Sequence, residues 1–164
     1  MAAEEVLASY QARVGGAHPH ALICSLNIAT ALCLEDDYGA AQAHVRRAVG
    51  GLESRLGPDH PYTLTAKLMQ ASVLARTDAL ADAEMLEEQV AARRTRVLGP
   101  RHPDTLRCRA NLLLTQAERG NRSATADRQQ VIGELRMMLG AEHPDVRGAD
   151  RQRRLLCVID PQPF

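Results

Sequence analysis

The dipeptide His-Pro recurs at a nearly constant interval, and this feature constrains the fold more than any other in the sequence. The spacings between successive copies are 42, 42 and 41 residues, and the flanking residues repeat as well. The four copies are VGGAHPHAL (14–22), LGPDHPYTL (56–64), LGPRHPDTL (98–106) and LGAEHPDVR (139–147). A repeat of this length predicts a stack of similar units, each covered by its neighbours.

Each period predicts two helices. In the first period, His18-Pro19 precedes apolar residues at helical spacing, such as Leu22, Leu26 and Ala29. Proline suits a first helical turn, and Leu-Gly-Pro ends the second helix of a period. Breaks between the two helices are expected near Asp36-Asp37, Asp78 and Gly120. The expected helices cover residues 3–13, 19–34, 38–55, 61–76, 80–97, 103–119, 123–138 and 144–158.

The expected fold class is all-α, a right-handed α-solenoid of antiparallel helix pairs with about eight helices. One domain would cover residues 1–158, followed by a tail at 159–164. Its parts are an orphan second helix (1–17), three repeats (18–59, 60–101 and 102–142) and a last first helix (143–158).

Both ends leave alternatives open. The orphan helix is a cap, a face covered by a partner, or the start of a piece of a longer protein. Its stripe of Val6, Tyr10 and Val14 also predicts a possible homodimer. The tail is either a frayed end or a short peptide that docks on a groove of its own or a neighbouring chain.

The repeat matches a known pattern, HPxTLxxxxNLAxxLxxxGxxxEAExL…LGP. The stretches that carry the match are His60-Pro61-Tyr62-Thr63-Leu64, His102-Pro103-Asp104-Thr105-Leu106 with Asn111-Leu112, Asn27-Ile28-Ala29 and Ala83-Glu84. The pattern resembles the 42-residue tetratricopeptide repeat of kinesin light chains and of many bacterial proteins. The Ala- and Arg-rich composition with a single lysine is typical of a bacterial protein of high GC content.

This resemblance implies a concave groove, lined by the first helices, that binds an extended peptide. Asparagines of the groove would hydrogen-bond the peptide backbone, and basic groups would take acidic side chains or a C-terminal carboxylate. An amide supplies both a donor and an acceptor, and arginine suits bidentate contact with a carboxylate. The alternative is that these are ordinary solvated residues. The candidate peptide-groove residues are Asn27, Met69, Asn111 and Gln152 at one repeat position, with Arg107, Arg151 and Arg154 as the cationic end.

Composition argues against several classes of partner. The chain has 20 Lys+Arg and 20 Asp+Glu in 164 residues, so it lacks the cationic field of a general nucleic-acid binder. Its aromatic residues are only three tyrosines and Phe164, too few to stack on bases. No apolar run is long enough to span a bilayer, and the N-terminus does not resemble a signal peptide. A cytoplasmic protein with reduced cysteines is therefore expected.

No motif predicts catalysis, a metal or a cofactor. The His-Pro histidines lie on repeats too far apart to share a zinc ion, so helix capping or turn packing is their expected role. His18 and His20 lack a third nearby ligand. Gly15-Gly16 and Gly50-Gly51 are interpreted as helix ends, and Cys24 and Cys108 as small core residues.

Three functions remain under consideration. The first is a non-enzymatic scaffold that binds a peptide segment of a partner protein, possibly acidic or C-terminal. The second is a regulatory or sensor segment of a larger bacterial NTPase or transcription regulator. The third is an enzyme, or an accessory subunit of one, with a pocket in the curve of the solenoid.

Overall fold

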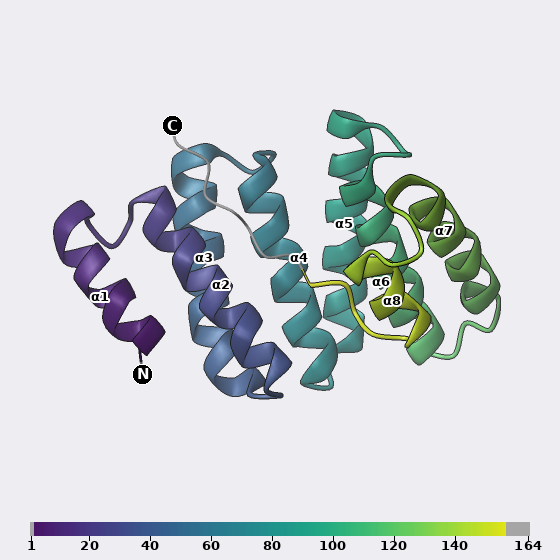
Figure 1. Cartoon of the computed structure of the whole chain (residues 1–164), viewed down its shortest axis with the longest axis horizontal. Coiled ribbons are helices and arrows are strands. Elements are labelled where there is room, and N and C mark those ends of the chain that lie inside the picture. Colours follow the sequence, from purple (N-terminus) through teal and green to yellow (C-terminus); the bar gives the residue numbers. More distant parts are fainter. Residues whose placement is uncertain (1, 157–164) are drawn as a thin grey trace. The chain divides into compact units, whose positions relative to one another are not determined.

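The computed structural model describes residues 2–156, which form eight α-helices and no strand (Figure 1). Seven helices agree with the expected ranges to within one residue at each end, and the eighth is shorter. The helices are α1 (Ala2–Val14), α2 (Pro19–Leu34), α3 (Tyr38–Leu56), α4 (Pro61–Arg76), α5 (Leu80–Leu98), α6 (Pro103–Glu118), α7 (Ser123–Leu139) and α8 (Pro144–Asp150).

Successive helices pack as antiparallel pairs, and the described residues divide into two compact units. The first unit holds residues 2–73 with Leu156, and the second holds residues 74–155. In the first, α2 packs on α3 around Leu22, Leu26 and Leu52. In the second, α6 packs on both α5 and α7, and its apolar cluster includes Leu106 and Ile132. The all-helical, paired architecture expected from the repeat is therefore confirmed.

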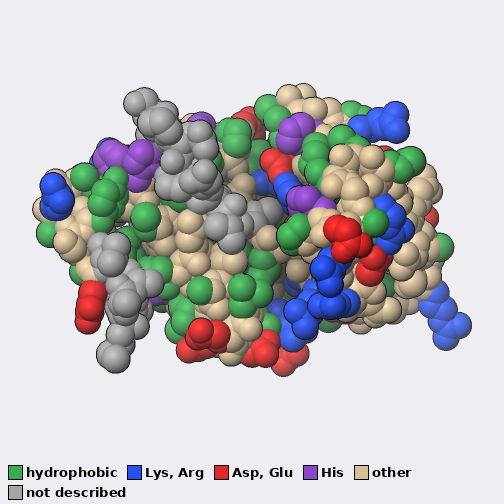
Figure 2. Space-filling view, in the orientation of Figure 1, with side chains coloured by type: hydrophobic (Ala, Val, Ile, Leu, Met, Phe, Trp, Pro, Cys, Tyr) green, Lys and Arg blue, Asp and Glu red, His purple; other side chains and the backbone are tan. Residues whose placement is uncertain are grey.

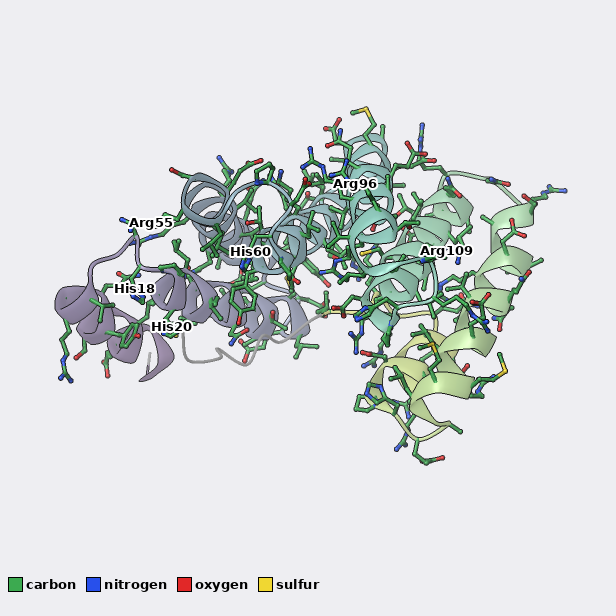
Figure 3. All side chains as sticks on the ribbon, turned by 90° about the horizontal axis from the view of Figure 1, so that it is seen from above. His18, His20, Arg55, His60, Arg96 and Arg109 are labelled. Atoms are coloured by element: carbon green, nitrogen blue, oxygen red, sulfur yellow. The ribbon has the colours of Figure 1, made fainter. Side chains whose placement is uncertain are left out.

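Each His-Pro histidine caps the helix that follows it. The Nδ1 atom accepts a hydrogen bond from the backbone N–H two residues later. The four N–Nδ1 distances are 3.3 Å at His18, 3.2 Å at His60, 3.1 Å at His102 and 3.2 Å at His143. Figure 3 shows His18 and His20 near the start of α2. The bond satisfies one of the amide groups that a helix leaves unpaired at its N-terminus, which confirms the capping prediction.

The breaks inside each period are left-handed turns, at the residues where the sequence predicted them. Asp36, Asp78 and Gly120 have φ values of 61°, 61° and 97°. After α2, the Asp37 N–H bonds to the Leu32 carbonyl and the Asp36 N–H to that of Cys33. This is the Schellman arrangement, which satisfies carbonyls at a helix C-terminus. The second helices α3, α5 and α7 instead end at Gly57, Gly99 and Gly140.

The expected last helix, 143–158, is wrong in length, because α8 ends at Asp150. The same Schellman arrangement closes it early: Gln152 has φ 56°, and the Arg153 N–H bonds to the Gly148 carbonyl. Gly148 weakens the helix just before this point. Residues 151–155, which we call the return segment, leave α8 without helical structure. They make contacts that a continuing helix could not make.

The structure also bears on the expectations for the paired glycines and for the first helix. Gly50 and Gly51 do not end a helix but lie inside α3, so that interpretation was wrong. In α1, the Tyr10 hydroxyl lies 3.4 Å from His20 Nδ1 of α2, and Val14 is exposed. The Val6 side chain, the last two residues of the expected 143–158 helix and the tail 159–164 lie outside the residues that the structure describes. None of the described helices is long and apolar enough to cross a membrane.

Candidate functional site

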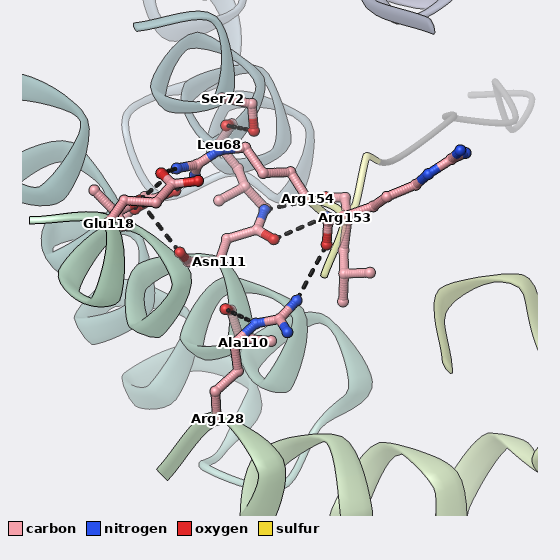
Figure 4. Close-up of polar contacts among 11 residues, drawn as sticks. Leu68, Ser72, Ala110, Asn111, Glu118, Arg128, Arg153 and Arg154 are labelled. Atoms are coloured by element: carbon pink, nitrogen blue, oxygen red, sulfur yellow. Dashed lines mark hydrogen bonds and ion pairs between the residues drawn. The ribbon is translucent and has the colours of Figure 1, made fainter. Parts of the chain in front are cut away.

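Asn111 holds the backbone of the return segment with both ends of its amide. Its Nδ2 donates to the Leu155 carbonyl at 3.1 Å, and its Oδ1 accepts from the Leu155 N–H at 2.8 Å. Asn111 lies on α6 and is fully buried. Figure 4 shows the polar contacts around it. The arrangement binds the backbone of one residue through its N–H donor and its C=O acceptor, which every non-proline residue offers.

The apolar core also holds the return segment. The Leu155 side chain is buried in the cluster formed by α6, α7 and α8, which includes Leu106, Ile132 and Val146. Full burial of a leucine side chain contributes roughly 1.5–3 kcal/mol relative to an exposed one. Backbone hydrogen bonds and side-chain burial therefore act on the same residue.

The preceding residue, Arg154, inserts its guanidinium among polar groups of α5 and α6. Its Nη1 lies 2.9 Å from Glu87 Oε1, and its Nη2 lies 2.7 Å from Glu118 Oε2 and 2.9 Å from Thr115 Oγ1. The Thr115 hydroxyl in turn donates to Glu87 Oε2 at 2.5 Å. We call Glu87, Thr115 and Glu118 the acceptor cluster. The Arg154 side chain is 7% exposed, so the ion pair with Glu87 is a buried one.

Glu87 is the unusual member of this cluster, because it is a carboxylate with no exposure on the inner face of α5. Burial raises its pKa from an ordinary 4.5 to about 7, although Arg154 and the hydroxyl of Thr115 act in the opposite direction. A buried carboxylate is costly unless it has a cation and hydrogen bonds. Arg154 and Thr115 supply both.

Arg128 of α7 fixes the start of the return segment. Its guanidinium donates to three backbone carbonyls, those of Ala110, Ala149 and Arg153, each at 3.1 Å. One carbonyl belongs to α6, one to the last turn of α8 and one to the return segment itself. Burial is the main cause that lowers the pKa of Arg128. This single side chain joins three parts of the second unit.

The structure distributes the predicted groove residues over several environments. Asn27 is half-buried on α2, whereas Met69 packs inside the apolar cluster of the first unit. Arg107 is bound to two carboxylates, those of Asp104 and Asp145. Its charge is therefore already balanced within the second unit.

The remaining three candidates lie beyond the end of α8, so they do not continue the face of a first helix. Arg151 and Gln152 are exposed in the turn. Arg154 is part of the return segment and points into the acceptor cluster. Of these three residues, only Arg154 packs against α5 and α6, and the residue after it is the one that Asn111 binds.

Sequence reasoning missed Glu87, Thr115, Glu118 and Arg128. A signal for two of them was present in the spacing. Glu87 stands four residues after Ala83, and Arg128 four residues after Ala124, each in line with the apolar stripe of its helix. A charged residue on a buried stripe indicates a paired internal charge.

The surface and the remaining reactive groups add few other candidates. In the part of Figure 2 that the second unit occupies, acidic and basic side chains lie beside one another. Among the described residues, no group of three His, Cys, Asp or Glu side chains could hold a metal ion. Burial raises the pKa of the Cys33 thiol to about 11, which suppresses the nucleophilic thiolate.

Part of the chain matches a known protein family. No curated protein matches the chain. Residues 21–94, which run from α2 into α5, match the family model described as tetratricopeptide repeat. The matched segment contains α3 and α4 in full, together with the turns at Asp36 and Asp78. Residues 21–94 are therefore similar to a tetratricopeptide repeat, and the described helices of the chain pack in pairs as such repeats do.

Proposed function

We propose that this protein is a non-catalytic interaction module that binds an extended peptide segment of a partner protein on the Asn111 face of α6. Tetratricopeptide repeats generally mediate interactions between proteins. The single observation that carries the proposal is the pair of hydrogen bonds between the Asn111 amide and the Leu155 backbone. A side chain that hydrogen-bonds the N–H and C=O of one residue can form the same bonds with a residue of another chain.

The 42-residue spacing supports repeats of the kinesin-light-chain type, and the composition supports a bacterial source. Asn27 occupies the position equivalent to Asn111 in the first repeat, so it is a second candidate backbone contact. Arg107 is a weaker candidate for an acidic ligand, because Asp104 and Asp145 already neutralise it. The other charged groups of α5 and α6 in this site, Glu87 and Glu118, are acidic and pair with Arg154.

Affinity capture from native lysate tests the proposal. The full chain would be compared with Asn111→Ala and with Gln129→Ala, which removes an exposed amide from α7. Circular dichroism and thermal unfolding would first establish that the variants are folded at the capture temperature. We expect a partner that the wild type and Gln129→Ala retain and that Asn111→Ala loses.

A peptide scan of that partner completes the test, because a short segment alone should reproduce the binding. Capture that is equal with Asn111→Ala would contradict the proposal. So would binding that no peptide of the partner reproduces, since this indicates recognition of a folded surface.

A further inference from the structure

We propose that the acceptor cluster is an arginine-recognition site, that the chain's own Arg154-Leu155 occupies it as an internal ligand, and that the partner segment which replaces it carries an arginine followed by an apolar residue. This inference rests on the proposed function and specifies the chemistry of the ligand. It concerns the Glu87, Thr115 and Glu118 side chains together with the Asn111 amide.

The geometry selects for a guanidinium. Both terminal nitrogens of Arg154 are used: Nη1 on Glu87, and Nη2 on Glu118 and Thr115. The acceptors come from two different helices, α5 and α6, so one flat, forked donor joins them. A lysine ammonium is a compact point charge and lacks this fork.

The requirement for a cation comes from Glu87. This carboxylate has no exposure to water, so removal of Arg154 leaves it either unpaired or protonated. Arg128 of α7 does not replace Arg154, because its guanidinium donates to three backbone carbonyls. An incoming arginine restores the pairing that an uncharged residue cannot restore.

Asn111 and the apolar cluster set the position that follows the arginine. Asn111 holds the backbone of Leu155, while the Leu155 side chain is buried among apolar residues. A ligand in the same register therefore places an arginine side chain in the acceptor cluster and the next, apolar side chain in the core. This is the basis for an Arg-Leu-like pair rather than an acidic segment.

Two features make the internal ligand replaceable. Gln152 adopts φ 56° in the turn that directs the segment back, a conformation that is unfavourable for residues other than glycine. The Nε of Arg154 is buried and has no hydrogen-bond partner. A separate chain needs no such turn, so it can form the same contacts without this strain. If the internal segment is bound about 90% of the time, it weakens the apparent affinity for a competitor about tenfold.

A binding assay with full-length chains tests the inference. The probe is a fluorescent, end-blocked peptide of sequence Arg-Gln-Arg-Arg-Leu-Leu, and a second probe has lysine in place of the fourth residue. Arg154→Gln removes the internal guanidinium, and Arg151→Gln is its matched control, since it makes the same change at an exposed position of the segment. We expect Arg154→Gln to bind the arginine probe at least tenfold more tightly than the wild type or Arg151→Gln does.

Two further comparisons complete the assay. The lysine probe should bind Arg154→Gln at least tenfold more weakly than the arginine probe does. The arginine probe should in turn bind the double variant Arg154→Gln/Glu87→Gln at least tenfold more weakly than it binds Arg154→Gln. Equal binding of the two probes, or no gain in Arg154→Gln, overturns the inference. A partner segment that requires Asn111 but contains no arginine also overturns it and leaves the proposed function intact.

Hydrogen exchange of the wild-type chain keeps the inference testable even if Arg154→Gln does not fold. The Leu155 amide bonds to Asn111, so a saturating arginine probe should accelerate its exchange by displacing the segment. The Leu106 amide, which bonds to the His102 carbonyl, serves as the internal control. Unchanged exchange at Leu155 in the presence of saturating probe contradicts displacement.

Discussion

Asn111 and Leu155 are 44 residues apart in sequence and are joined by two hydrogen bonds in opposite directions. The amide of one side chain thus does for Leu155 what a neighbouring strand does in a sheet, where each residue needs a partner for its N–H and its C=O. Because both groups are buried, the consequence of losing Asn111 is larger than the strength of two exposed hydrogen bonds.

Replacement of Asn111 by alanine should therefore lower the free energy of unfolding by about 2–4 kcal/mol, because it leaves the N–H and C=O of Leu155 unsatisfied. Urea denaturation followed by circular dichroism measures this change. Gln129→Ala, at an exposed position on α7, should stay within about 0.5 kcal/mol of the wild type. A change below that size for Asn111→Ala would show that water satisfies the Leu155 groups.

Replacement of Arg128 by lysine should lower the free energy of unfolding by about 2–3 kcal/mol, since an ammonium cannot reach the three carbonyls that the guanidinium bridges. Because lysine keeps the positive charge, the loss of stability measures the contribution of the guanidinium hydrogen bonds. Arg101→Lys, at an exposed loop residue, is the matched change. Denaturant titration of both variants decides the matter, and equal stability would argue against a bridging role.

The sequence predicted the helices well because their signals are local. Histidine caps, left-handed turns and glycine ends each depend on a few neighbouring residues, as at His18 and Asp36. The early end of α8 depends on partners far away in sequence, namely Arg128 and Asn111. Helical spacing alone could not reveal that competition, because the apolar residues after Asp150 fit a helix equally well.

The candidate site was predicted only in part for the same reason. Asn111 was identified from its repeat position, whereas Arg154 was expected to line the groove and instead lies in the segment that fills the site. Its acidic partners come from α5 and α6, and the pairing spans 67 residues between Arg154 and Glu87. The sequence alone does not reveal whether a basic residue lines a binding site or occupies a site within its own chain.

The raised pKa of Glu87 makes stability depend on pH in a defined direction. With a pKa of about 7 in the folded chain against an ordinary 4.5, the folded state retains a proton between these values that the unfolded state has lost. This contribution to stability is fully present below about pH 4.5 and is lost as the pH rises to about 7. The stability of the wild type relative to Glu87→Gln should therefore fall over this range and level off above it.

Unfolding titrations of both chains at pH 5, 6, 7 and 8 measure this difference. Glu88→Gln is the matched control, because it changes an exposed neighbour on the same helix. A difference that stays constant with pH, or one that rises between pH 5 and 7, would contradict the raised pKa.

His60 should have the opposite pH dependence. Burial lowers its pKa below the ordinary 6.5, and its Nδ1 must be unprotonated to accept from the Tyr62 N–H. The unfolded chain therefore binds the proton first as the pH falls. The stability that His60 contributes is present above about pH 6.5 and declines below it.

A His60→Asn variant isolates this effect, since asparagine is a good cap and does not titrate. The stability of the wild type relative to the variant should decrease between pH 7 and pH 5. Measuring the difference between the two chains removes the contributions of the other five histidines. A difference independent of pH would show that the cap of α4 is insensitive to protonation of His60.

The adjacent glycines of α3 should respond in opposite ways to alanine. A Cβ at Gly50 meets nothing within 4 Å, whereas one at Gly51 lies 2.5 Å from Leu22 Cδ1, inside the α2–α3 contact. Alanine favours a helix by about 0.8–1 kcal/mol over glycine, so Gly50→Ala should stabilise the protein by up to that amount. Gly51→Ala should destabilise it by about 1–3 kcal/mol, because Leu22 is buried and the core has little room to adjust. Thermal unfolding of the two variants gives the comparison, in which each substitution controls for the helix propensity of the other. If both variants were stabilised equally, Leu22 would have moved aside at no cost, and the close packing of α2 on α3 would not be what requires glycine at position 51.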